Sequence, residues 1–373
     1  MKIAIEAQRL FRRKKHGMEI VALEIIKELQ NINTDDTFFV IAKNDLDDQC
    51  ISETENFTIK KINSKFYPFW EQVSLPQLLK KIKPDILHCT ANTAPLFFSA
   101  KLVITIHDVI YMESVNFSGS NYQNFGNLYR KFIVPKVAKK AKVIITVSEF
   151  EKKVISKKLG ISENKIRVIY NAVNPQFKMM NKESSLSFKN KYQLPDDFIL
   201  HFGNTAPKKN TIGVLKAYSL YSSNNKNDFT LVITDCSKDY IESLLREINE
   251  PELIKKIQIL NYISFSEVPL LYNLSTVFLY PSLRESFGMP LVEAMACGIP
   301  VVTSNTSALP EIAGGAAILV DPKNAAEMAE QINILINNAE LYNSYKEKGL
   351  KNARRFNWSD AAKKTLEIYN ELA

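Results

Sequence analysis

The chain has 373 residues, enough for two domains, and its 46% hydrophobic and 24% charged content is typical of a globular protein. A formal net charge of +8 indicates anionic partners, either nucleotide phosphates or an acidic membrane surface, but it is too spread out to indicate nucleic acid. No apolar run is long enough to span a membrane. The four cysteines have no metal-ligand spacing and are expected to be reduced and mostly buried: Cys50, Cys89, Cys236 and Cys297.

Apolar, β-branched runs alternate with helical patterns along the first half of the chain. The runs cover residues 3–7, 38–42, 85–89, 102–107, 143–147 and 166–173. Charges follow the first run at once, so it predicts a strand rather than a signal peptide, and we expect a cytoplasmic protein. A period of 3.6 over residues 18–29 predicts the first helix.

The same alternation starts again after about residue 175. Its apolar runs cover residues 198–203, 229–234, 257–263, 277–281, 300–304 and 316–320, and residues 211–222 have a helical period. Nearly continuous apolar strands separated by helices predict parallel sheets covered on both faces, so the fold class is α/β with two doubly wound domains. Ligands of such sheets bind beyond the carboxyl ends of the strands, which predicts a site in the cleft between the two domains.

Residues 281–302, PSLRESFGMPLVEAMACGIPVV, place two carboxylates, Glu285 and Glu293, around a junction between a loop and a helix. Pro290 suits the first turn of a helix and Gly298 its end, which predicts a helix over residues 290–297. A helix N-terminus favours a phosphate, whereas carboxylates repel a phosphate and are suited to hydroxyl groups. Hydroxyls and a phosphate together describe a nucleotide sugar. The alternative is an ordinary capped helix with two exposed glutamates.

This segment resembles the signature of retaining glycosyltransferases of family 4, which have the GT-B fold of two Rossmann-like domains. The matching residues are Glu285, Phe287, Gly288, Glu293, Gly298, Pro300, Val301 and Val302, while Ser286 stands where a glycine is usual. Other segments, at residues 147–150, 170–173, 261–264 and 356–358, also resemble landmarks of this family, so the resemblance covers nearly the whole chain. It implies an acceptor-side domain over residues 1–175, a nucleotide-sugar-binding domain over residues 176–352, and a closing helix over residues 353–373 that crosses back to the first domain.

The loop after residues 198–203 places two lysines before a helix. Cations at a helix N-terminus are electrostatically misplaced unless an anion neutralises them, which favours a phosphate over an ordinary solvated loop. The family has Gly, four residues, then Arg-Lys-Asn at this place. The resemblance therefore implies that Gly203, Lys208 and Lys209 bind the donor diphosphate, with Lys208 lacking the fork of the usual arginine. It also implies that Tyr262 lies where the nucleobase binds.

Two loops of the first half are further candidates. Gly17 follows the basic run of residues 12–15, and a glycine there lets the backbone approach a ligand, although a turn glycine is the alternative. His107 ends the run 102–107, where the family has a histidine that contacts the donor sugar; His88 is a weaker candidate of the same kind.

The resemblance implies transfer with retention by same-face attack, in which the leaving phosphate accepts the acceptor's proton. Glu285 and His107 would be the catalytic residues that hold the donor sugar. Lys208, Lys209 and a helix N-terminus replace a metal ion at the diphosphate, since we interpret the Asp45-x-Asp47 pair as a solvated turn. Phe287, Gly288 and Glu293 would bind the donor too, with Glu293 on the ribose. No metal and no cofactor is expected besides the nucleotide-sugar substrate.

Residues 70–88 resemble the mannosyltransferase-like branch of the family, which favours mannose from GDP-mannose, moved onto a glycan or lipid-linked glycan acceptor in polysaccharide biosynthesis. The alternatives are a UDP-sugar-dependent transferase of the same family or a non-transferase GT-B enzyme such as a nucleotide-sugar epimerase. An NAD-dependent dehydrogenase is disfavoured because no Gly-x-Gly-x-x-Gly follows a strand. The aromatic side chains within residues 66–70, followed by Lys80, Lys81 and Lys83, suit peripheral contact with an anionic membrane, with core packing of the aromatics as the alternative.

Overall fold

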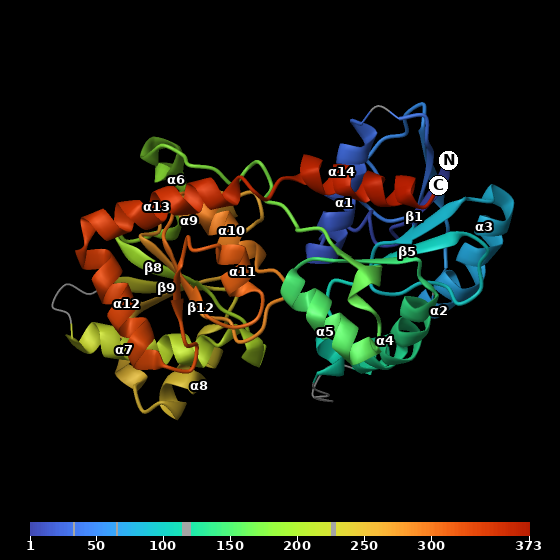
Figure 1. Ribbon diagram of the computed structural model, residues 1–373. Coiled ribbons are helices and arrows are strands. Elements are labelled where there is room, and N and C mark those ends of the chain that lie inside the picture. The colour runs from blue at the N-terminus through green and yellow to red at the C-terminus, as the bar shows by residue number, and fades with distance from the viewer. Residues whose placement is uncertain (33, 65, 114–120, 225–228) are drawn as a thin grey trace. The chain divides into compact units, whose positions relative to one another are not determined.

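The computed structural model describes residues 1–32, 34–64, 66–113, 121–224 and 229–373, which form two compact units. Unit 1 consists of Met1–Ala172 together with Trp358–Ala373, and unit 2 consists of Val173–Asn357. Figure 1 shows that each unit is a sheet between layers of helices.

The sheet of unit 1 is entirely parallel, with the strand order β3-β2-β1-β4-β5-β6-β7. Its strands are β1 (Lys2–Glu6), β2 (Thr37–Ala42), β3 (Phe57–Lys61), β4 (Ile86–Cys89), β5 (Lys101–Thr105), β6 (Val143–Thr146) and β7 (Ile166–Val168). Its helices are α1 (Gly17–Gln30), α2 (Tyr67–Phe69), α3 (Leu75–Ile82), α4 (Asn121–Lys140), α5 (Glu149–Leu159) and α14 (Trp358–Glu371). A π-helical segment covers Trp70–Ser74, and 3₁₀ turns cover Ile110–Met112 and Glu163–Lys165.

Successive side chains of each strand point to opposite faces of the sheet, so unit 1 has two apolar layers. On one face, Ile5 and Val40 pack with Ile26 of α1 and Tyr369 of α14, and Figure 1 shows these two helices side by side. On the other face, strand residues such as Ile104 pack with α3, α4 and α5. The last helix of the chain therefore completes the core of the domain that begins the chain.

The sheet of unit 2 is also parallel, with the order β10-β9-β8-β11-β12-β13. Its strands are β8 (Phe198–Phe202), β9 (Thr230–Thr234), β10 (Ile257–Leu260), β11 (Val277–Tyr280), β12 (Val301–Ser304) and β13 (Ile318–Val320). Its helices are α6 (Lys182–Tyr192), α7 (Thr211–Asn224), α8 (Lys238–Glu247), α9 (Val268–Leu274), α10 (Met289–Ala296), α11 (Leu309–Ala313), α12 (Ala325–Asn337) and α13 (Ala339–Ala353), with 3₁₀ turns at Pro207–Lys209 and Pro251–Lys256.

The predicted pair of doubly wound α/β domains is confirmed, and every predicted apolar run overlaps a strand. Among the described residues, the pattern missed β3, an edge strand that ends in two lysines and shows little apolar signal. Phe57 of this strand stacks on Phe38 of β2, with ring centroids 4.3 Å apart. Within the described ranges, no helix combines the length and the apolar character needed to cross a bilayer.

Candidate active site

In unit 2, two loops at the carboxyl edge of the sheet are tied together by backbone and amide hydrogen bonds. Asn210 takes a left-handed conformation with φ of 59°, and its side-chain amide donates to the carbonyls of Pro281 (3.1 Å) and Pro322 (2.7 Å). The backbone N–H of Leu283 donates to the carbonyl of Lys208 at 2.7 Å. These bonds hold the lysine loop after β8 against the glutamate loop after β11.

The carboxylate of Glu285 receives two hydrogen bonds at one oxygen. Lys209 Nζ lies 2.7 Å from Glu285 Oε1, and the Tyr280 hydroxyl donates to the same oxygen at 2.8 Å. Lys209 also donates to the Tyr280 hydroxyl at 3.2 Å, which closes a triangle of three polar groups. The second carboxylate oxygen takes part in none of these contacts.

The backbone of Glu285 is fixed independently of its side chain. Its N–H donates to the Ser307 hydroxyl at 3.1 Å, and its carbonyl accepts from the Arg284 guanidinium at 3.0 Å and from the Ala308 N–H. Such a held loop keeps the carboxylate in one place, which is what a preorganised site requires.

Charge and burial act against each other on this cluster. Burial acts to raise the pKa of the Glu285 carboxyl, but the charges of Lys209 and Lys208 and the hydrogen bonds from Lys209 and Tyr280 outweigh it and hold that pKa below its usual value. Burial acts to lower the pKa of Lys209, yet Tyr280 and Glu285 raise it above its ordinary value. Both groups therefore stay charged at neutral pH.

Helix α10 carries the second glutamate in a different environment. Gly288 caps this helix with φ of 100°, a conformation that favours glycine, and the helix begins at Met289, one residue before the predicted start. Glu293 accepts a hydrogen bond of 3.2 Å from the Tyr272 hydroxyl and is 8% exposed. Burial raises the pKa of Glu293 to about 7, so its carboxyl is partly protonated near neutrality.

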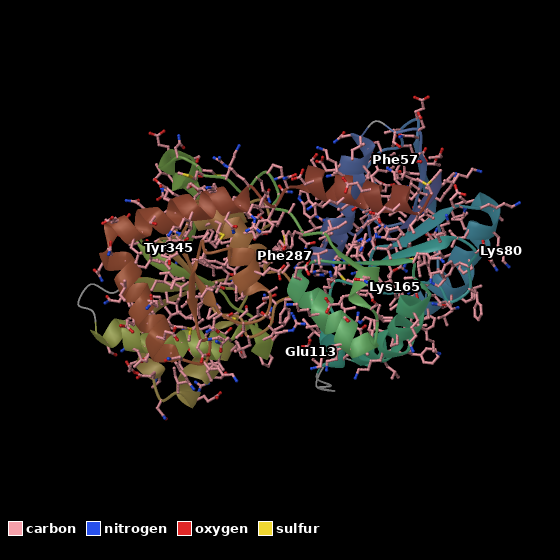
Figure 2. The ribbon with its side chains drawn as sticks, viewed as in Figure 1. Phe57, Lys80, Glu113, Lys165, Phe287 and Tyr345 are labelled. Atoms are coloured by element: carbon pink, nitrogen blue, oxygen red, sulfur yellow. The ribbon has the colours of Figure 1, made fainter. Side chains whose placement is uncertain are left out.

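The remaining predicted donor residues of unit 2 differ in how they are placed. Phe287 is buried, and its ring meets Phe356 edge-on with centroids 5.4 Å apart, so the side chain packs inside the unit; Figure 2 labels it. Tyr262 follows β10 and is 59% exposed. A Cβ at Gly203 would lie 2.5 Å from the Cys236 sulfur and 2.9 Å from Ile233, so packing alone already requires a glycine there.

Two buried polar atoms near this edge have no hydrogen-bond partner within the described part of the chain. They are Nε2 of His201, on β8, and the hydroxyl of Ser282, just after β11. Buried polar groups normally find a partner, so orphaned atoms of this kind are compatible with a ligand or water at the site.

In unit 1, Gly17 is the first residue of α1 and follows the cap residue His16. The Glu19 carboxylate accepts from the His16 N–H at 2.8 Å. Nothing lies within 4 Å of a Cβ placed on Gly17, and its φ is not left-handed, so neither packing nor backbone strain demands this glycine. The basic run before it is engaged inside the unit, since Lys15 pairs with Asp47 and Arg12 lies 3.7 Å from Glu19.

His107 follows β5 and is buried at 6% exposure. Its backbone N–H donates to the Asn92 side chain at 2.7 Å, and its Nε2 lies 3.0 Å from the Thr90 carbonyl. A carbonyl only accepts, so Nε2 carries the proton and Nδ1 is left as an acceptor in the neutral ring. Burial lowers the pKa of His107, which favours this neutral form.

His88 lies deeper in unit 1. Its Nδ1 lies 2.6 Å from the Tyr369 hydroxyl of α14, and its Nε2 lies 2.8 Å from the Thr105 hydroxyl. Burial lowers its pKa to about 3. Nδ1 thus joins the closing helix to the sheet, and Nε2 bonds to the neighbouring strand β5.

The sequence analysis did not identify three polar residues near the carboxyl edges of the sheets as candidate site residues: Tyr280, Glu6 and Glu71. Glu6 ends β1, and burial, with the nearby charge of Glu71, raises its pKa to about 8. Glu71 accepts from the hydroxyls of Tyr67, Thr93 and Tyr129. A charged residue within the apolar run 3–7 was the available signal for Glu6. For Tyr280 the signal was a tyrosine near the end of the apolar run 277–281, five residues before Glu285.

Within the described ranges, no three His, Cys, Asp or Glu side chains gather in a way that could hold a metal ion. Of the two carboxylates in the Asp45-x-Asp47 pair, Asp47 is held by Lys15.

Two family profiles match the chain, one in each half. Residues 16–177 match the profile of glycosyltransferase family 4, and residues 183–352 match that of glycosyl transferases group 1. The chain belongs to this family of glycosyltransferases. The family motif contains the Glu285–Glu293 pair, and the Lys209–Glu285 contact joins it to the lysine loop.

Curated relatives include O-antigen mannosyltransferases. The O-antigen chain mannosyltransferase B of Escherichia coli is 29% identical over 233 residues, which is 62% of this chain and 61% of that protein. The O-antigen chain mannosyltransferase RfbU of Salmonella typhimurium is 29% identical over 256 residues, or 69% of this chain and 65% of the relative. The alignments thus cover less than two thirds of the length of these relatives.

Solved structures share the GT-B fold with this chain. A sucrose-phosphate synthase of Thermosynechococcus elongatus superposes with a TM-score of 0.74 at 17% identity, over 100% of this chain and 98% of that one. HepE of Anabaena, in complex with UDP and glucose, gives 0.71 at 19% identity, with 99% of both chains covered. Identities this low establish the fold alone.

Proposed function

We propose that the protein transfers a hexosyl group from a nucleotide sugar to a glycan or lipid-linked glycan acceptor in polysaccharide biosynthesis. The observation that carries this proposal is the charged cluster of Lys209, Tyr280 and Glu285, held at the carboxyl edge of a Rossmann-like sheet inside the family motif. A cation and a carboxylate kept ionised side by side match a ligand that presents a diphosphate next to sugar hydroxyls.

Each residue has a defined role in this proposal. Lys208 and Lys209 bind the diphosphate, and the Glu285 carboxylate accepts hydrogen bonds from the hydroxyls of the donor sugar. The backbone at Phe287 and Gly288 lies at the α10 N-terminus, where free N–H groups suit the same ligand. Glu293, buried and partly protonated, binds the ribose hydroxyls, and Tyr262 the base.

We propose that the transfer retains configuration. The bond between the anomeric carbon and the diphosphate oxygen breaks as the acceptor hydroxyl bonds to the same face of that carbon, and the leaving phosphate oxygen takes the hydroxyl proton. No protein base is required. Neutral His107, with Nδ1 as an acceptor, suits a positioning hydrogen bond from a sugar hydroxyl rather than proton transfer. Gly17 leaves room for a ligand beside α1.

The donor assignment is GDP-mannose. This assignment is supported by the similarity of the chain to relatives that are named as O-antigen mannosyltransferases. A UDP-sugar is the second candidate, because HepE, with a similar fold, is described in complex with UDP-glucose. Incubation with a panel of nucleotide sugars decides between them, since only the true donor releases nucleoside diphosphate when acceptor is added. A nucleotide-sugar epimerase would act without acceptor.

Substitution of the two glutamates tests the site. We expect Glu285→Ala and Glu293→Ala each to lower transfer by about 10²-fold or more, the size of effect seen when one preorganised polar group is lost. Glu267→Ala, which removes a surface carboxylate paired with Lys191, is the control and should transfer normally. Near-normal turnover in both site variants would refute the assignment. A β-linked mannoside product would refute retention.

We propose that the two lysines and the α10 N-terminus stabilise the leaving diphosphate without a metal ion. Activity should then survive EDTA. Complete loss with EDTA and recovery with manganese or magnesium would contradict this part of the proposal alone.

A further inference from the structure

Helix α4 presents large apolar side chains to solvent on the side opposite to its buried face. Phe125, Leu128 and Phe132 are 47%, 66% and 58% exposed. They are spaced three and four residues apart, so they form one stripe along the helix. Ile133, Val134, Val137 and Ala138 of the same helix are buried against the sheet. An apolar stripe that the domain core does not need points to an external partner.

Neighbouring segments extend this stripe at both ends. At one end the Phe66 ring lies 5.8 Å from that of Phe125, and both Phe66 and Phe69 are 54% exposed. At the other end Lys140 donates to the Leu96 carbonyl at 2.6 Å, which brings the exposed ring of Phe97 beside the end of α4. We call this surface the α4 face; its apolar members are Phe66, Phe69, Phe97, Phe125, Leu128 and Phe132.

Only some of the aromatic side chains within residues 66–70, which the sequence predicted to touch a membrane, belong to the α4 face. Trp70 is fully buried, and its indole N–H donates to the Ile62 carbonyl at 3.0 Å. The Tyr67 hydroxyl is held by Glu71 and Thr93. The residues of this segment that remain exposed, Phe66 and Phe69, belong to the α4 face.

The charged residues of α4 itself have one sign. From Phe125 to the end of α4 the charged residues are Arg130, Lys131, Lys136, Lys139 and Lys140, with no carboxylate among them. The Lys136 ammonium lies 3.3 Å from the centroid of the Phe132 ring, so cation and aromatic ring occupy one spot. Helix α3 packs in the same core cluster as α4 and carries Lys80 and Lys81 with no carboxylate, and Figure 2 shows Lys80 projecting outward.

This combination selects between the two obvious partners. A second copy of the chain would bring a second cluster of five cations against the first, which is unfavourable. An anionic bilayer neutralises the lysines, and its interface accepts aromatic rings while the long lysine stems keep their ammonium groups at the headgroups. We propose that the α4 face docks on the surface of an anionic lipid bilayer.

Binding to vesicles tests this without any donor or acceptor, so its outcome is independent of the proposed transfer reaction. The full chain is sedimented with vesicles of phosphatidylcholine alone or mixed with phosphatidylglycerol. We expect binding to the mixed vesicles at low salt and dissociation as salt rises. Equal binding to both kinds of vesicle, or none to the anionic ones, would overturn the proposal.

Two pairs of charge reversals separate the α4 face from net charge. Lys136→Glu with Lys139→Glu should weaken binding by about tenfold or more. The matched control is Lys157→Glu with Lys158→Glu on α5, which makes the same change of net charge at exposed positions elsewhere in unit 1 and should bind nearly normally. Equal losses in the two variants would overturn the assignment to α4.

The apolar part has its own variants. Leu128→Ser with Phe132→Ser should weaken binding several-fold at constant charge, whereas Leu220→Ser, at an exposed apolar position in unit 2, should not. Circular dichroism checks that each variant is folded. If the chain instead forms a dimer that the Leu128 and Phe132 changes dissolve, and does not bind vesicles, the face is a contact between copies and the proposal is wrong.

Discussion

Lys209 and Glu285 stand 76 residues apart in the chain, yet the lysine ammonium lies 2.7 Å from the glutamate carboxylate. The contact joins the loop after β8 to the loop after β11, two strands that are neighbours in the sheet. In the structure the proposed diphosphate-binding cation and the proposed sugar-binding carboxylate neutralise each other. Donor binding would replace this internal pair by contacts of each group with the donor.

The two adjacent lysines should therefore not be equivalent. Lys209→Ala leaves Glu285 buried without its nearest counter-ion, and we expect a loss of unfolding free energy of about 3 kcal/mol. We choose a value at the lower end of the range for breaking a buried ion pair, because the Lys209 side chain is 23% exposed. Lys208→Ala should leave stability unchanged while weakening donor binding. Chemical denaturation and donor titration measure the two effects.

The matched double variant separates stability from function. Lys209→Met with Glu285→Gln removes both charges, so it should recover most of the stability lost in Lys209→Ala but remain inactive. Equal stability of Lys208→Ala and Lys209→Ala would contradict this reading of the pair.

Tyr280 should tune the ionisation of Glu285. Its hydroxyl donates to the carboxylate, one of the contacts that hold the pKa of Glu285 below the usual value. Tyr280→Phe removes that hydrogen bond, so the pKa should rise and the acidic limb of the pH profile of kcat/KM should move to higher pH. The activity at neutral pH should fall by about tenfold or less.

Tyr218→Phe is the control, because the hydroxyl of this buried tyrosine of the same unit lies within hydrogen-bond distance of the carbonyls of Phe229 (3.0 Å) and Lys256 (2.9 Å). It loses a hydroxyl that is bonded to the backbone, so it should lower stability without moving the pH profile. An unchanged acidic limb in Tyr280→Phe would show that Tyr280 does not act on Glu285.

Glu293 should make the protein less stable as pH rises. Its pKa is raised by burial from 4.5 to about 7 in the folded chain. Between these values the folded state binds more protons than the unfolded state, so the unfolding free energy falls with rising pH. The glutamine of Glu293→Gln cannot ionise, so the variant should not lose this stability. The unfolding free energy of the variant minus that of the wild type should increase by about 1–3 kcal/mol from pH 5 to pH 8.

Denaturation curves of both proteins over this range provide the measurement. Taking the difference removes the contribution of Glu6, whose pKa is also raised by burial. A difference that stays constant with pH would mean that Glu293 is ionised throughout.

Two glycines of the predicted site should respond oppositely to alanine. Gly17→Ala has room for its Cβ at the start of α1, so the melting temperature should stay equal or rise, since alanine favours a helix by up to about 1 kcal/mol. Transfer should fall by about tenfold or more if a ligand approaches the backbone here. Unchanged kcat/KM would remove Gly17 from the site.

Gly203→Ala should instead lower the stability of the protein. Its Cβ would press on the Cys236 sulfur and on Ile233, so we expect a loss of about 1–3 kcal/mol in unfolding free energy before any effect on the ligand. Thermal melts of both variants make the comparison. A stable Gly203→Ala would contradict the packing argument.

The sequence by itself determined the two doubly wound domains and the two loops of the candidate site. Nearly continuous apolar runs and helices of period 3.6 are local signals, and the glutamate motif lies within a single stretch of residues 281–302. The edge strand β3 escaped because a strand at an edge, with lysines at its end, buries little apolar surface.

Only the tertiary structure decided which side chains meet. The hydrogen bonds of Lys209 to Glu285 and of His88 to Tyr369 depend on strand order and helix packing, which bring together residues far apart in the chain. The exposure of the α4 stripe depends on helix packing too. Periodicity marks a residue as apolar, but it does not say whether another element covers it. Trp70 and Phe132 are both aromatic residues near lysines, and packing buried the first and left the second in solvent.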